Sequence, residues 1–306
     1  MIKILITEFI NNDSLKKLKK VFKVHYDKKL WQYPKNISNI IKDFDCLIVR
    51  NKTEVNKNLL HDANKIRLIG RLGVGLDNID TKYCNLKKIH IQPATGMNAD
   101  SVAEYVVTCS LFLIKKISLF HEKTLKGMWP RTSIISNEIN GKNLGIIGYG
   151  SVGKKVSDYF SKMGLNIIVH DKYLKKFDRK KKFHFSGLSF LLKNSDIISV
   201  HVPLTDKSKN LIRKNSFIKM KKKPIIINTS RGSIVNQNDL LDAYSKNLIS
   251  GFALDVFDTE PVQRNFLNKI KKNMNCILTP HISGVTYQSN SRVSNFIVDK
   301  VIDFFN

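Results

Sequence analysis

The stretch LGIIGYGSVGKKV, Leu144–Val156, decides the fold of this chain. Its first residues are apolar and predict a β-strand, and the residues from Ser151 onward predict a helix. Between them, Gly148, Gly150 and Gly153 follow the spacing G-x-G-x-x-G. The first glycine permits a tight turn, the second lets the backbone approach a pyrophosphate, and the third lets helix and strand pack closely. The stretch therefore predicts a dinucleotide-binding βαβ unit.

An acidic residue follows at the end of the next predicted strand. Asp171 closes the stretch NIIVHD and lies 18 residues beyond Gly153. A carboxylate here accepts hydrogen bonds from the adenosine ribose and repels a 2′-phosphate, so the pattern favours NAD over NADP. Two alternatives stay open: a glycine-rich turn in some other α/β protein, and a helix-capping role for Asp171.

Strand and helix signals alternate on both sides of the glycine turn. Apolar, β-branched runs predict five strands before it, at residues 2–6, 23–26, 46–49, 67–72 and 90–92. Six more are predicted from the turn onward, at residues 144–147, 166–170, 197–200, 225–228, 250–254 and 276–278. Repeated β–α alternation indicates parallel sheets covered by helices. The expected fold class is therefore α/β, with two doubly wound parallel-sheet domains.

Helical patterns fill the intervals between these strands. Asp13 is placed to cap the first helix, and one long helix is predicted from Asn98 to Gly127. Its apolar face is longer than one domain needs, so we expect it to bridge domains or meet a second subunit. The chain closes on a helical face over residues 288–305. Further helices are predicted at residues 151–163, 188–193, 208–218 and 237–246.

The length of 306 residues suggests about two domains. No run of about 18 apolar residues occurs, so no membrane span is expected. The N-terminal residues lack a cleavage-site pattern and predict a strand rather than a signal peptide, so we expect a cytoplasmic protein. The four cysteines form no C-x-x-C pair, so neither a metal site nor a disulfide framework is predicted; they are Cys46, Cys84, Cys109 and Cys276.

The net charge of +27 raises the alternative of a polyanionic partner such as nucleic acid. We prefer the explanation that lysine is the general surface residue of this chain. The lysines are spread along the whole sequence, and the two dense runs, Arg179–Phe183 and Lys219–Lys223, fall between predicted elements. No nucleic-acid-binding motif accompanies them, so we expect no nucleic-acid partner. A positive field would still help to collect small anionic substrates.

Three later stretches place polar residues directly after apolar strands. INTSRGSIV carries Arg231, ALDVFDTEP carries Asp255 and Glu260, and LTPHISG carries His281. In an open α/β sheet the carboxyl ends of the strands line the ligand crevice, so Arg231, Glu260 and His281 are expected to converge there. Taken singly, each has a plain structural explanation: a surface arginine, a helix-capping glutamate and a buried core histidine.

These residue types suit the oxidation of a 2-hydroxy acid. A guanidinium binds a carboxylate through two hydrogen bonds and polarises a carbonyl oxygen. An imidazole titrates near neutral pH and can accept the hydroxyl proton as hydride leaves. A neighbouring glutamate holds the imidazole in orientation, and Asp255 is placed to hydrogen-bond the nicotinamide region.

The order of these motifs resembles that of the D-isomer-specific 2-hydroxyacid dehydrogenases, across essentially the whole chain. The motifs are GYGSVG, HVPLT, NTSRGSIVN, ALDVFDTEP and TPHISG. The resemblance implies an NAD-dependent enzyme without a metal, with Arg231, Glu260 and His281 as its catalytic set. It implies cofactor contacts from the glycine turn and from strand ends, namely Gly148, Gly150, Ser151, Val152, Gly153, Asp171, Pro203, Thr229, Asp255 and Gly284.

The resemblance also implies that the NAD domain is inserted into the substrate domain. Residues 1–97 and 282–306 would form a flavodoxin-like substrate domain, and residues 98–281 a Rossmann domain. The crossings near Pro93–Gly96 and Ile282–Gly284 contain the proline and glycine expected of a hinge that closes over substrate. A homodimer is expected from the family and from the long apolar helix.

Within this family, GRLGVGLDNID resembles the substrate-carboxylate loop of the phosphoglycerate dehydrogenase branch. Arginines beyond the carboxylate site suggest a second anionic group, a phosphate or a sulfonate; the alternative is a solvated surface pair of arginines. LITEF and GMWPR also resemble (S)-sulfolactate dehydrogenases, and Arg131 could reach a neighbouring active site in a dimer. The implied substrate contacts are Arg50, Arg71, Val74, Gly75 and Asn98.

The sequence thus favours an enzyme similar to 3-phosphoglycerate dehydrogenase. The alternatives are an (S)-sulfolactate dehydrogenase and a glyoxylate or hydroxypyruvate type of enzyme. A protein of another class also stays open, an NAD(H)-sensing corepressor on the same fold. The Arg–Glu–His set argues against that alternative, because a sensor has no need of a proton-transfer histidine.

Overall fold

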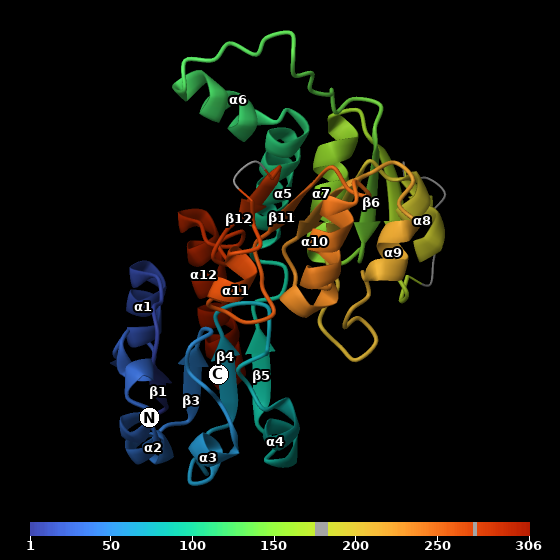
Figure 1. Cartoon of the computed structure of the whole chain (residues 1–306). Helices are drawn as coiled ribbons and strands as arrows, with labels where there is room; N and C mark the ends of the chain where they lie inside the picture. Colours follow the sequence, from blue (N-terminus) through green and yellow to red (C-terminus); the bar gives the residue numbers. More distant parts are fainter. Residues whose placement is uncertain (175–182, 272–273) are drawn as a thin grey trace. The chain divides into compact units, whose positions relative to one another are not determined.

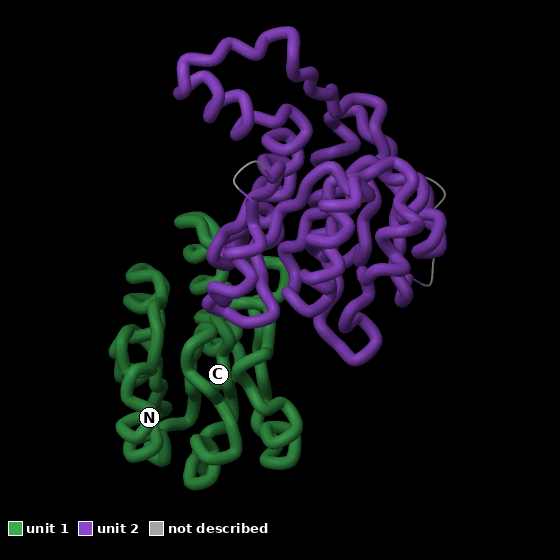
Figure 2. The backbone as a smooth tube through the Cα atoms, in the orientation of Figure 1, with its two compact units in different colours: residues 1–98, 285–306 green, residues 99–284 purple. Residues whose placement is uncertain are grey.

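The computed structural model describes residues 1–174, 183–271 and 274–306. The chain forms two compact units, green and purple in Figure 2: unit 1 comprises residues 1–98 and 285–306, and unit 2 comprises residues 99–284. Of the basic run Arg179–Phe183, only Phe183 lies among the described residues. Each unit contains one parallel sheet with helices, so the predicted α/β class is confirmed.

Unit 1 is built on a five-stranded sheet in the order β2-β1-β3-β4-β5. Every neighbouring pair is parallel, and the register pairs Val49 with Arg71 at the ends of β3 and β4. β3 and β4 are buried along their whole length, which explains their continuous apolar runs. The strands are β1 Lys3–Ile6, β2 Lys23–Tyr26, β3 Cys46–Val49, β4 Leu68–Arg71 and β5 His90–Pro93.

Two helices from distant parts of the sequence share one apolar core of unit 1. They are α1, Asn12–Lys19, and α12, Tyr287–Phe305 (Figure 1). Leu18 of α1 and Ile297 of α12 are fully buried in a cluster with side chains of β1, β3 and β4. A second apolar core of unit 1 contains side chains from the other helices and from two short 3-10 turns. The helices are α2 Pro34–Ile40, α3 Lys57–Leu60 and α4 Thr81–Leu86, and the turns are Leu30–Gln32 and Ile41–Asp43.

Unit 2 contains a seven-stranded sheet in the order β12-β11-β10-β9-β6-β7-β8, and all its pairs are parallel. The topology reverses between β6 and β9, as in doubly wound folds. The short edge strand β8 was not predicted. The strands are β6 Asn143–Ile147, β7 Asn166–His170, β8 Phe183–Phe185, β9 Ile197–Val200, β10 Ile225–Asn228, β11 Gly251–Leu254 and β12 Cys276–Leu278.

Helices contribute to two apolar cores of unit 2. α5, Ala99–Ile114, and α7, Ser151–Lys162, contribute Val106, Val156 and Phe160 to one core. The other core holds side chains of three further helices, which are α8 Leu188–Asn194, α9 Lys214–Ile218 and α10 Gln237–Ser245. The remaining elements are α6 Ile117–Leu125, the 3-10 turn Gly232–Ile234 and α11 Arg264–Leu267.

Three helix predictions are wrong in detail. The single long helix expected over residues 98–127 is two helices, because α5 ends at Ile114 and Lys116 adopts a left-handed conformation with φ of 53°. The helix expected over residues 208–218 begins only at Lys214, since Asn210 is also left-handed with φ of 51°. Asn11 rather than Asp13 caps α1: its side chain accepts hydrogen bonds from the first backbone N–H groups.

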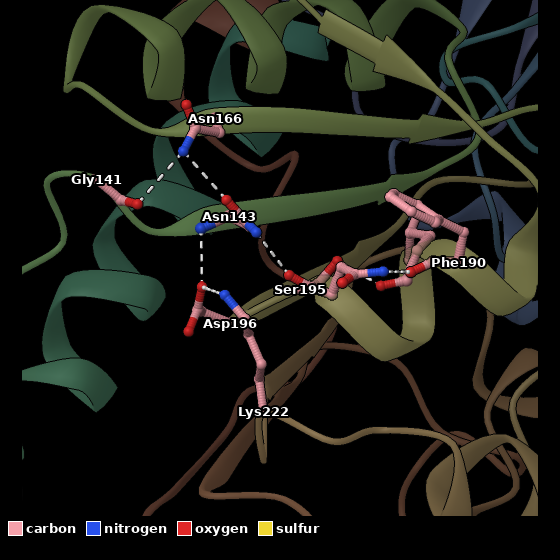
Figure 3. Close-up of polar contacts among 9 residues, drawn as sticks. Gly141, Asn143, Asn166, Phe190, Ser195, Asp196 and Lys222 are labelled. Carbon is pink, nitrogen blue, oxygen red and sulfur yellow. Dashed lines mark hydrogen bonds and ion pairs between the residues drawn. The ribbon is translucent and has the colours of Figure 1, made fainter.

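Polar side chains tie together the amino ends of β6, β7 and β9 (Figure 3). The backbone N–H of Asn143 donates to Oδ2 of Asp196 at 2.9 Å, and its side chain donates to the carbonyl of Asn194 at 2.7 Å. Nδ2 of Asn166 donates to Oδ1 of Asn143 at 3.1 Å, and Nζ of Lys222 lies 3.4 Å from Oδ2 of Asp196. These contacts satisfy polar groups at the strand starts. The predicted catalytic residues lie at the opposite, carboxyl edge of this sheet, in the loops that follow β10, β11 and β12.

Among residues 1–174, 183–271 and 274–306, no helix is long and apolar enough to cross a membrane. The same residues contain no group of three or more His, Cys, Asp or Glu side chains arranged to hold a metal ion.

Candidate active site

The strand order of unit 2 brings three predicted site residues to one edge of its sheet. β10, β11 and β12 are parallel neighbours, and Arg231, Glu260 and His281 lie in the loops that follow them. Gly232 shows how closely two of these loops approach. A Cβ atom at Gly232 would come 2.0 Å from the backbone carbonyl carbon of Phe257. Glycine is therefore needed for the loop after β10 to lie against the loop after β11.

Glu260 and His281 form a direct pair. Nδ1 of His281 lies 2.8 Å from Oε2 of Glu260, and Oε1 of the same carboxylate accepts a hydrogen bond from the backbone N–H of Phe257 at 3.1 Å. An ionised carboxylate has no hydrogen to donate, so Nδ1 carries the ring proton. Nε2 then keeps a lone pair. Because 46% of the His281 side chain is exposed, this nitrogen can accept a proton from a small molecule.

The turn that carries His281 is held by the fully buried carboxylate of Asp255. Oδ1 of Asp255 accepts from the backbone N–H of Ile282, and Oδ2 from that of Ser283, both at 2.8 Å. The hydroxyl of Thr279 donates to Oδ1 at 2.5 Å, and the backbone N–H of His281 donates to the carbonyl of Asp255 at 2.9 Å. One residue therefore fixes the backbone on both sides of the histidine.

This clamp explains an unusual backbone conformation. His281 has φ of 56°, in the left-handed region that residues other than glycine seldom adopt. Such a conformation costs about 1–2 kcal/mol and persists where the surrounding structure enforces it.

The hydrogen bonds that Asp255 makes within the protein were not predicted from the sequence. The expected contact of Asp255 with the nicotinamide stays a prediction. Gly284, another predicted cofactor contact, is the last residue of unit 2 and directly follows the clamped turn.

Arg231 lies three residues beyond the end of β10. Its carbonyl accepts a hydrogen bond from Nδ2 of Asn228 at 2.9 Å, which fixes the backbone of the loop. Nη1 of Arg231 donates to the carbonyl of Ser230 at 2.6 Å, and the side chain is partly exposed. A guanidinium has five N–H donors in a planar fork, so it can make this contact and bind a carboxylate through two others.

The glycine turn has the close approaches that its spacing predicts. Gly148 has φ of 96°, and a Cβ atom there would lie 2.5 Å from the carbonyl oxygen of His201. A Cβ atom on Gly153 would lie 2.1 Å from the carbonyl oxygen of Gly148. Gly150 differs, because nothing in the described chain lies within 4 Å of its Cβ position. Two glycines therefore serve the packing of the turn, while Gly150 borders open space.

The start of α7 offers backbone donors beside this open space. Gly150 is the N-cap, and no side chain among the described residues caps this end of the helix. The first N–H groups, those of Ser151, Val152 and Gly153, have no partner within an α-helix. An uncapped helix start with its positive dipole end is suited to a phosphate group.

Asp171 links the end of β7 to the glycine turn. Its Oδ2 accepts from the backbone N–H of Tyr149 at 2.7 Å, and its Oδ1 accepts from that of Tyr173 at 2.8 Å. The carboxylate is partly exposed, so its remaining lone pairs can accept hydrogen bonds from a ribose. Asp171 caps none of the described helices, so the helix-cap alternative finds no support among them, and the two backbone contacts are compatible with the ribose role.

A buried hydroxyl completes the fit to a dinucleotide. Oγ1 of Thr229, just after β10, is buried and has no hydrogen-bond partner within residues 1–174, 183–271 and 274–306. Buried polar atoms are normally paired, so a ligand atom is a natural partner for this one. Pro203, a predicted contact after β9, is exposed. The glycine turn, the uncapped helix and Asp171 together with Thr229 fit NAD.

His201 was missed by the sequence analysis, although it belongs to the motif HVPLT. It directly follows β9, and its ring Nε2 lies 2.8 Å from Oγ of Ser199. Burial lowers the pKa of His201 to about 3, so the imidazole is neutral at physiological pH. With its carbonyl against Gly148, His201 forms a wall of the glycine turn and is not a candidate acid or base.

In unit 1, Arg50 follows β3 at the carboxyl edge of the sheet. Its Nη2 donates to Oδ1 of Asn290 on α12 at 2.8 Å, and its guanidinium lies 5.7 Å from the ring centre of Phe9. Burial lowers the pKa of Arg50, and the carboxylate of Glu8 partly opposes this effect. An arginine remains protonated at neutral pH even so, and Arg50 is therefore a fixed, half-buried cation.

Glu8 is a second residue that the sequence analysis missed. It lies two residues beyond β1 and is only 3% exposed. Its carboxylate accepts hydrogen bonds from the backbone N–H groups of Arg50, Lys52 and Thr53, at 2.8, 3.1 and 3.0 Å. A buried carboxylate is tolerated where several donors satisfy it. Glu8 therefore holds the loop that carries Arg50.

The remaining predicted substrate contacts lie after β4 and at the end of the first segment of unit 1. Arg71 is 9% exposed, so the alternative of a solvated surface pair is wrong for it. A Cβ atom on Gly73 would lie 1.9 Å from Nη1 of Arg71, so this guanidinium lies directly against its own loop. Val74 is 40% exposed and Gly75 partly so. Oδ1 of Asn98 is buried without a partner among the described residues.

Comparison with known proteins assigns a family to unit 2. Residues 107–283 match the model of the D-isomer specific 2-hydroxyacid dehydrogenase, NAD binding domain. This segment contains the glycine turn, Asp171 and all three of Arg231, Glu260 and His281. Unit 2 is therefore an NAD-binding domain.

Similarity to individual proteins extends over nearly the whole chain. (S)-sulfolactate dehydrogenase of Chromohalobacter salexigens is 34% identical over 300 residues, 97% of this chain and 96% of that protein. D-3-phosphoglycerate dehydrogenase of Methanocaldococcus jannaschii is 32% identical over 98% of this chain, which spans 57% of that protein. The structure of D-lactate dehydrogenase from Aquifex aeolicus, complexed with NAD and lactic acid, matches 99% of this chain and 95% of its own at a TM-score of 0.86 and 29% identity. The chain belongs to the D-isomer specific 2-hydroxyacid dehydrogenase family.

Proposed function

We propose that this protein is an NAD-dependent dehydrogenase that interconverts a small anionic 2-hydroxy acid and its 2-oxo acid. The observation that carries the proposal is the 2.8 Å contact between Nδ1 of His281 and Glu260 within an NAD-binding domain of this family. Arg231 supports it, because its loop follows the strand adjacent to the one that precedes Glu260.

Each of the three side chains has a distinct task in this proposal. NAD supplies the hydride acceptor when it is bound. In the oxidation direction, Nε2 of His281 accepts the proton of the substrate hydroxyl as the hydrogen on C2 leaves with its electron pair. Glu260 accepts the Nδ1 hydrogen bond and stabilises the positive charge that develops on the ring. Arg231 holds the substrate carboxylate and polarises the oxygen that becomes a carbonyl.

The proposed substrate carries a second acidic group besides its carboxylate. Arg50 is a half-buried cation on a loop held by Glu8, and this fixed positive charge suits a phosphate or a sulfonate. On this basis we propose 3-phosphoglycerate as substrate, with (S)-sulfolactate as the second candidate. The second candidate is supported by the 34% identity to an (S)-sulfolactate dehydrogenase along 97% of the chain.

A panel of 2-oxo acids tests the proposal. NADH oxidation is measured with phosphohydroxypyruvate, sulfopyruvate, hydroxypyruvate and glyoxylate side by side. The proposal predicts turnover, with the highest kcat/KM for one of the two acids that carry a phosphate or a sulfonate. A preference for hydroxypyruvate or glyoxylate would reject the second acidic group but keep the dehydrogenase. Tight NADH binding without turnover of any acid would contradict the proposed dehydrogenase activity and favour an NAD(H)-sensing protein on the same fold.

Replacing the proposed base tests the chemistry directly. His281→Ala should lower kcat at least about 100-fold while NADH still binds, because general base catalysis typically contributes this much. Binding is followed by the quenching of NADH fluorescence or by calorimetry. Turnover close to that of the wild-type enzyme would overturn the role of His281.

The proposal includes a homodimer formed through α6 and the loop that follows it. No residue of α6 is buried, and several large apolar side chains stand exposed here, namely Ile117, Leu125, Trp129 and Ile135. Monomeric proteins seldom expose apolar residues in such a group. Leu125→Ser should shift the mass in light scattering from dimer to monomer. Leu86→Ser removes an equally exposed leucine of unit 1 and should not. A wild-type protein that is already monomeric would exclude the dimer.

A further inference from the structure

A chain of hydrogen bonds leads from α5 to the turn that carries His281. The phenol oxygen of Tyr105, on α5, lies 2.6 Å from Oγ1 of Thr279. Thr279 in turn donates to Oδ1 of Asp255 at 2.5 Å. All of these residues belong to unit 2, although 174 positions separate Tyr105 from Thr279. Tyr105 is not among the residues that the family motifs point to.

The chemistry of the groups fixes the direction of this chain. The Asp255 carboxylate is acceptor-only when ionised, and the backbone N–H groups of Ile282 and Ser283 both donate to it. The single hydroxyl hydrogen of Thr279 is therefore used on Asp255. The short contact between Tyr105 and Thr279 then requires the phenol to be the donor. Burial raises the pKa of Tyr105, so the phenol keeps the hydrogen that this contact needs.

A competing acceptor lies one helical turn away. The thiol of Cys109 also interacts with the Tyr105 phenol. Sulfur is a weak acceptor, whereas a hydroxyl oxygen at 2.6 Å is a good one, so the phenol hydrogen goes to Thr279. In this arrangement every donor of the chain has one acceptor, and hydrogen bonds arranged in series polarise and strengthen one another.

We propose that Tyr105 is a positioning residue for the catalytic histidine, acting only through Thr279 and Asp255. By donating to Thr279, it holds the threonine in the rotamer that donates to Asp255, and so tightens the clamp on the backbone around His281. This inference rests on the proposed role of His281 as proton acceptor. A histidine held at φ of 56° depends on such support, because relaxation of the turn carries the imidazole away from Glu260.

The test uses four variants and the rate of the chemical step. Tyr105→Phe and Thr279→Val remove one and two links of the chain, Thr279→Ser restores the hydroxyl, and the fourth variant combines Tyr105→Phe with Thr279→Val. The single-turnover rate of NADH oxidation is measured with the acid of the panel that reacts fastest, well below the Tm of every variant. A single-turnover rate separates the chemistry from product release.

The proposal predicts a specific pattern of rates. Tyr105→Phe should lower the rate about three- to tenfold, the effect of one ordinary hydrogen bond, and Thr279→Val at least as much. Thr279→Ser should stay within about twofold of wild type. In the Thr279→Val background, Tyr105→Phe should have no further effect, because its only route to the histidine is already broken.

A matched control separates positioning from general stability. Tyr244 on α10 is partly buried, and its phenol oxygen accepts a hydrogen bond from the backbone N–H of Asn275 at 2.9 Å. Tyr244→Phe should lower the Tm about as much as Tyr105→Phe but leave the single-turnover rate unchanged.

Two results would overturn the inference: an unchanged rate in Tyr105→Phe, or effects of the two substitutions that simply multiply. His281→Ala, measured alongside, distinguishes the two proposals. If it keeps its activity, the role of His281 fails; if it is inactive while Tyr105→Phe is normal, only the role of Tyr105 fails.

Discussion

Glu260 and His281 contact each other at 2.8 Å although they lie 21 residues apart in loops that follow different strands. The glutamate is anchored by the backbone N–H of Phe257, and the histidine turn is anchored by Asp255. Glu260 and the turn that carries His281 are therefore each held by separate hydrogen bonds, and neither depends on the other for its position. This preorganisation favours a defined ring orientation before any substrate arrives.

Removing the charge of the glutamate tests this contact. Glu260→Gln keeps the size of the side chain but weakens the acceptor for Nδ1 of His281, so we expect kcat to fall about 10- to 100-fold. The Kd of NADH should change little. Asp258→Asn, which removes the same charge from an exposed side chain of the same loop, should leave kcat unchanged. Equal effects of the two substitutions would mean that only the charge of the loop matters.

The preference for NAD over NADP should depend on Asp171. Asp171→Ala removes the carboxylate that repels a 2′-phosphate, so the ratio of kcat/KM for NAD to that for NADP should fall at least about tenfold. Asp158→Ala provides the control, because it removes an exposed carboxylate of α7 in the same unit. An unchanged ratio in Asp171→Ala would contradict the ribose contact.

Gly232 allows a sharp test of loop packing. In Gly232→Ala the new methyl group would meet the backbone of Phe257 and Asp258, which cannot rotate away as a side chain could. We expect the free energy of unfolding to fall by about 1–3 kcal/mol, with a loss of kcat because the Glu260 loop is displaced. Urea denaturation and steady-state kinetics measure the two effects.

Gly187→Ala is the matched control for that substitution. Nothing in the described chain lies within 4 Å of the added methyl group, and the backbone φ of −66° suits alanine. Its stability should stay within about 1 kcal/mol of wild type. If the two alanine variants behaved alike, close packing of the loops would not be the reason for glycine at position 232.

His201 should make the stability of the protein depend on pH. Burial lowers its pKa to about 3, so between about pH 6.5 and pH 3 the unfolded chain binds a proton here that the folded chain does not. The free energy of unfolding therefore decreases as the pH falls through this window, by about 2 kcal/mol at pH 5. His201→Gln should remove this part of the difference between pH 7 and pH 5 in urea denaturation.

A surface histidine provides the reference for that experiment. His121 lies exposed on α6, and His121→Gln should retain the pH dependence of the wild-type protein. If His201→Gln showed the wild-type slope as well, protonation of His201 would not limit the stability below pH 6.5.

The sequence predicted the sheets well because most strands are buried on both faces. β9 and β10 coincide with their predicted ranges, since a fully buried strand reads as a short continuous apolar run. β8 was missed because Phe183–Phe185 is a partly exposed edge strand of three residues with no such run. The break between α5 and α6 was missed because Lys116 turns left-handed without the glycine that usually marks such a turn.

Within the candidate site, residues of contiguous motifs were predictable and their partners were not. Arg231, Glu260 and His281 each stand in a short stretch that carries its own signal after a strand. The contact of Tyr105 with Thr279 spans 174 residues, and that of Glu8 with Arg50 spans 42. Contacts of this kind arise only from tertiary packing, so local spacing carries no sign of them.

Unit 1 is made of two segments that are synthesised at different times, because the whole of unit 2 lies between them in the sequence. Its first 98 residues leave the ribosome without α12, the helix whose Val293, Ile297 and Val301 complete one of their cores. Unit 2 is continuous in sequence and meets no such delay. Domains generally fold as units while the nascent chain grows. We therefore expect unit 2 to reach its final fold first, while the earlier segment of unit 1 waits until α12 has been made.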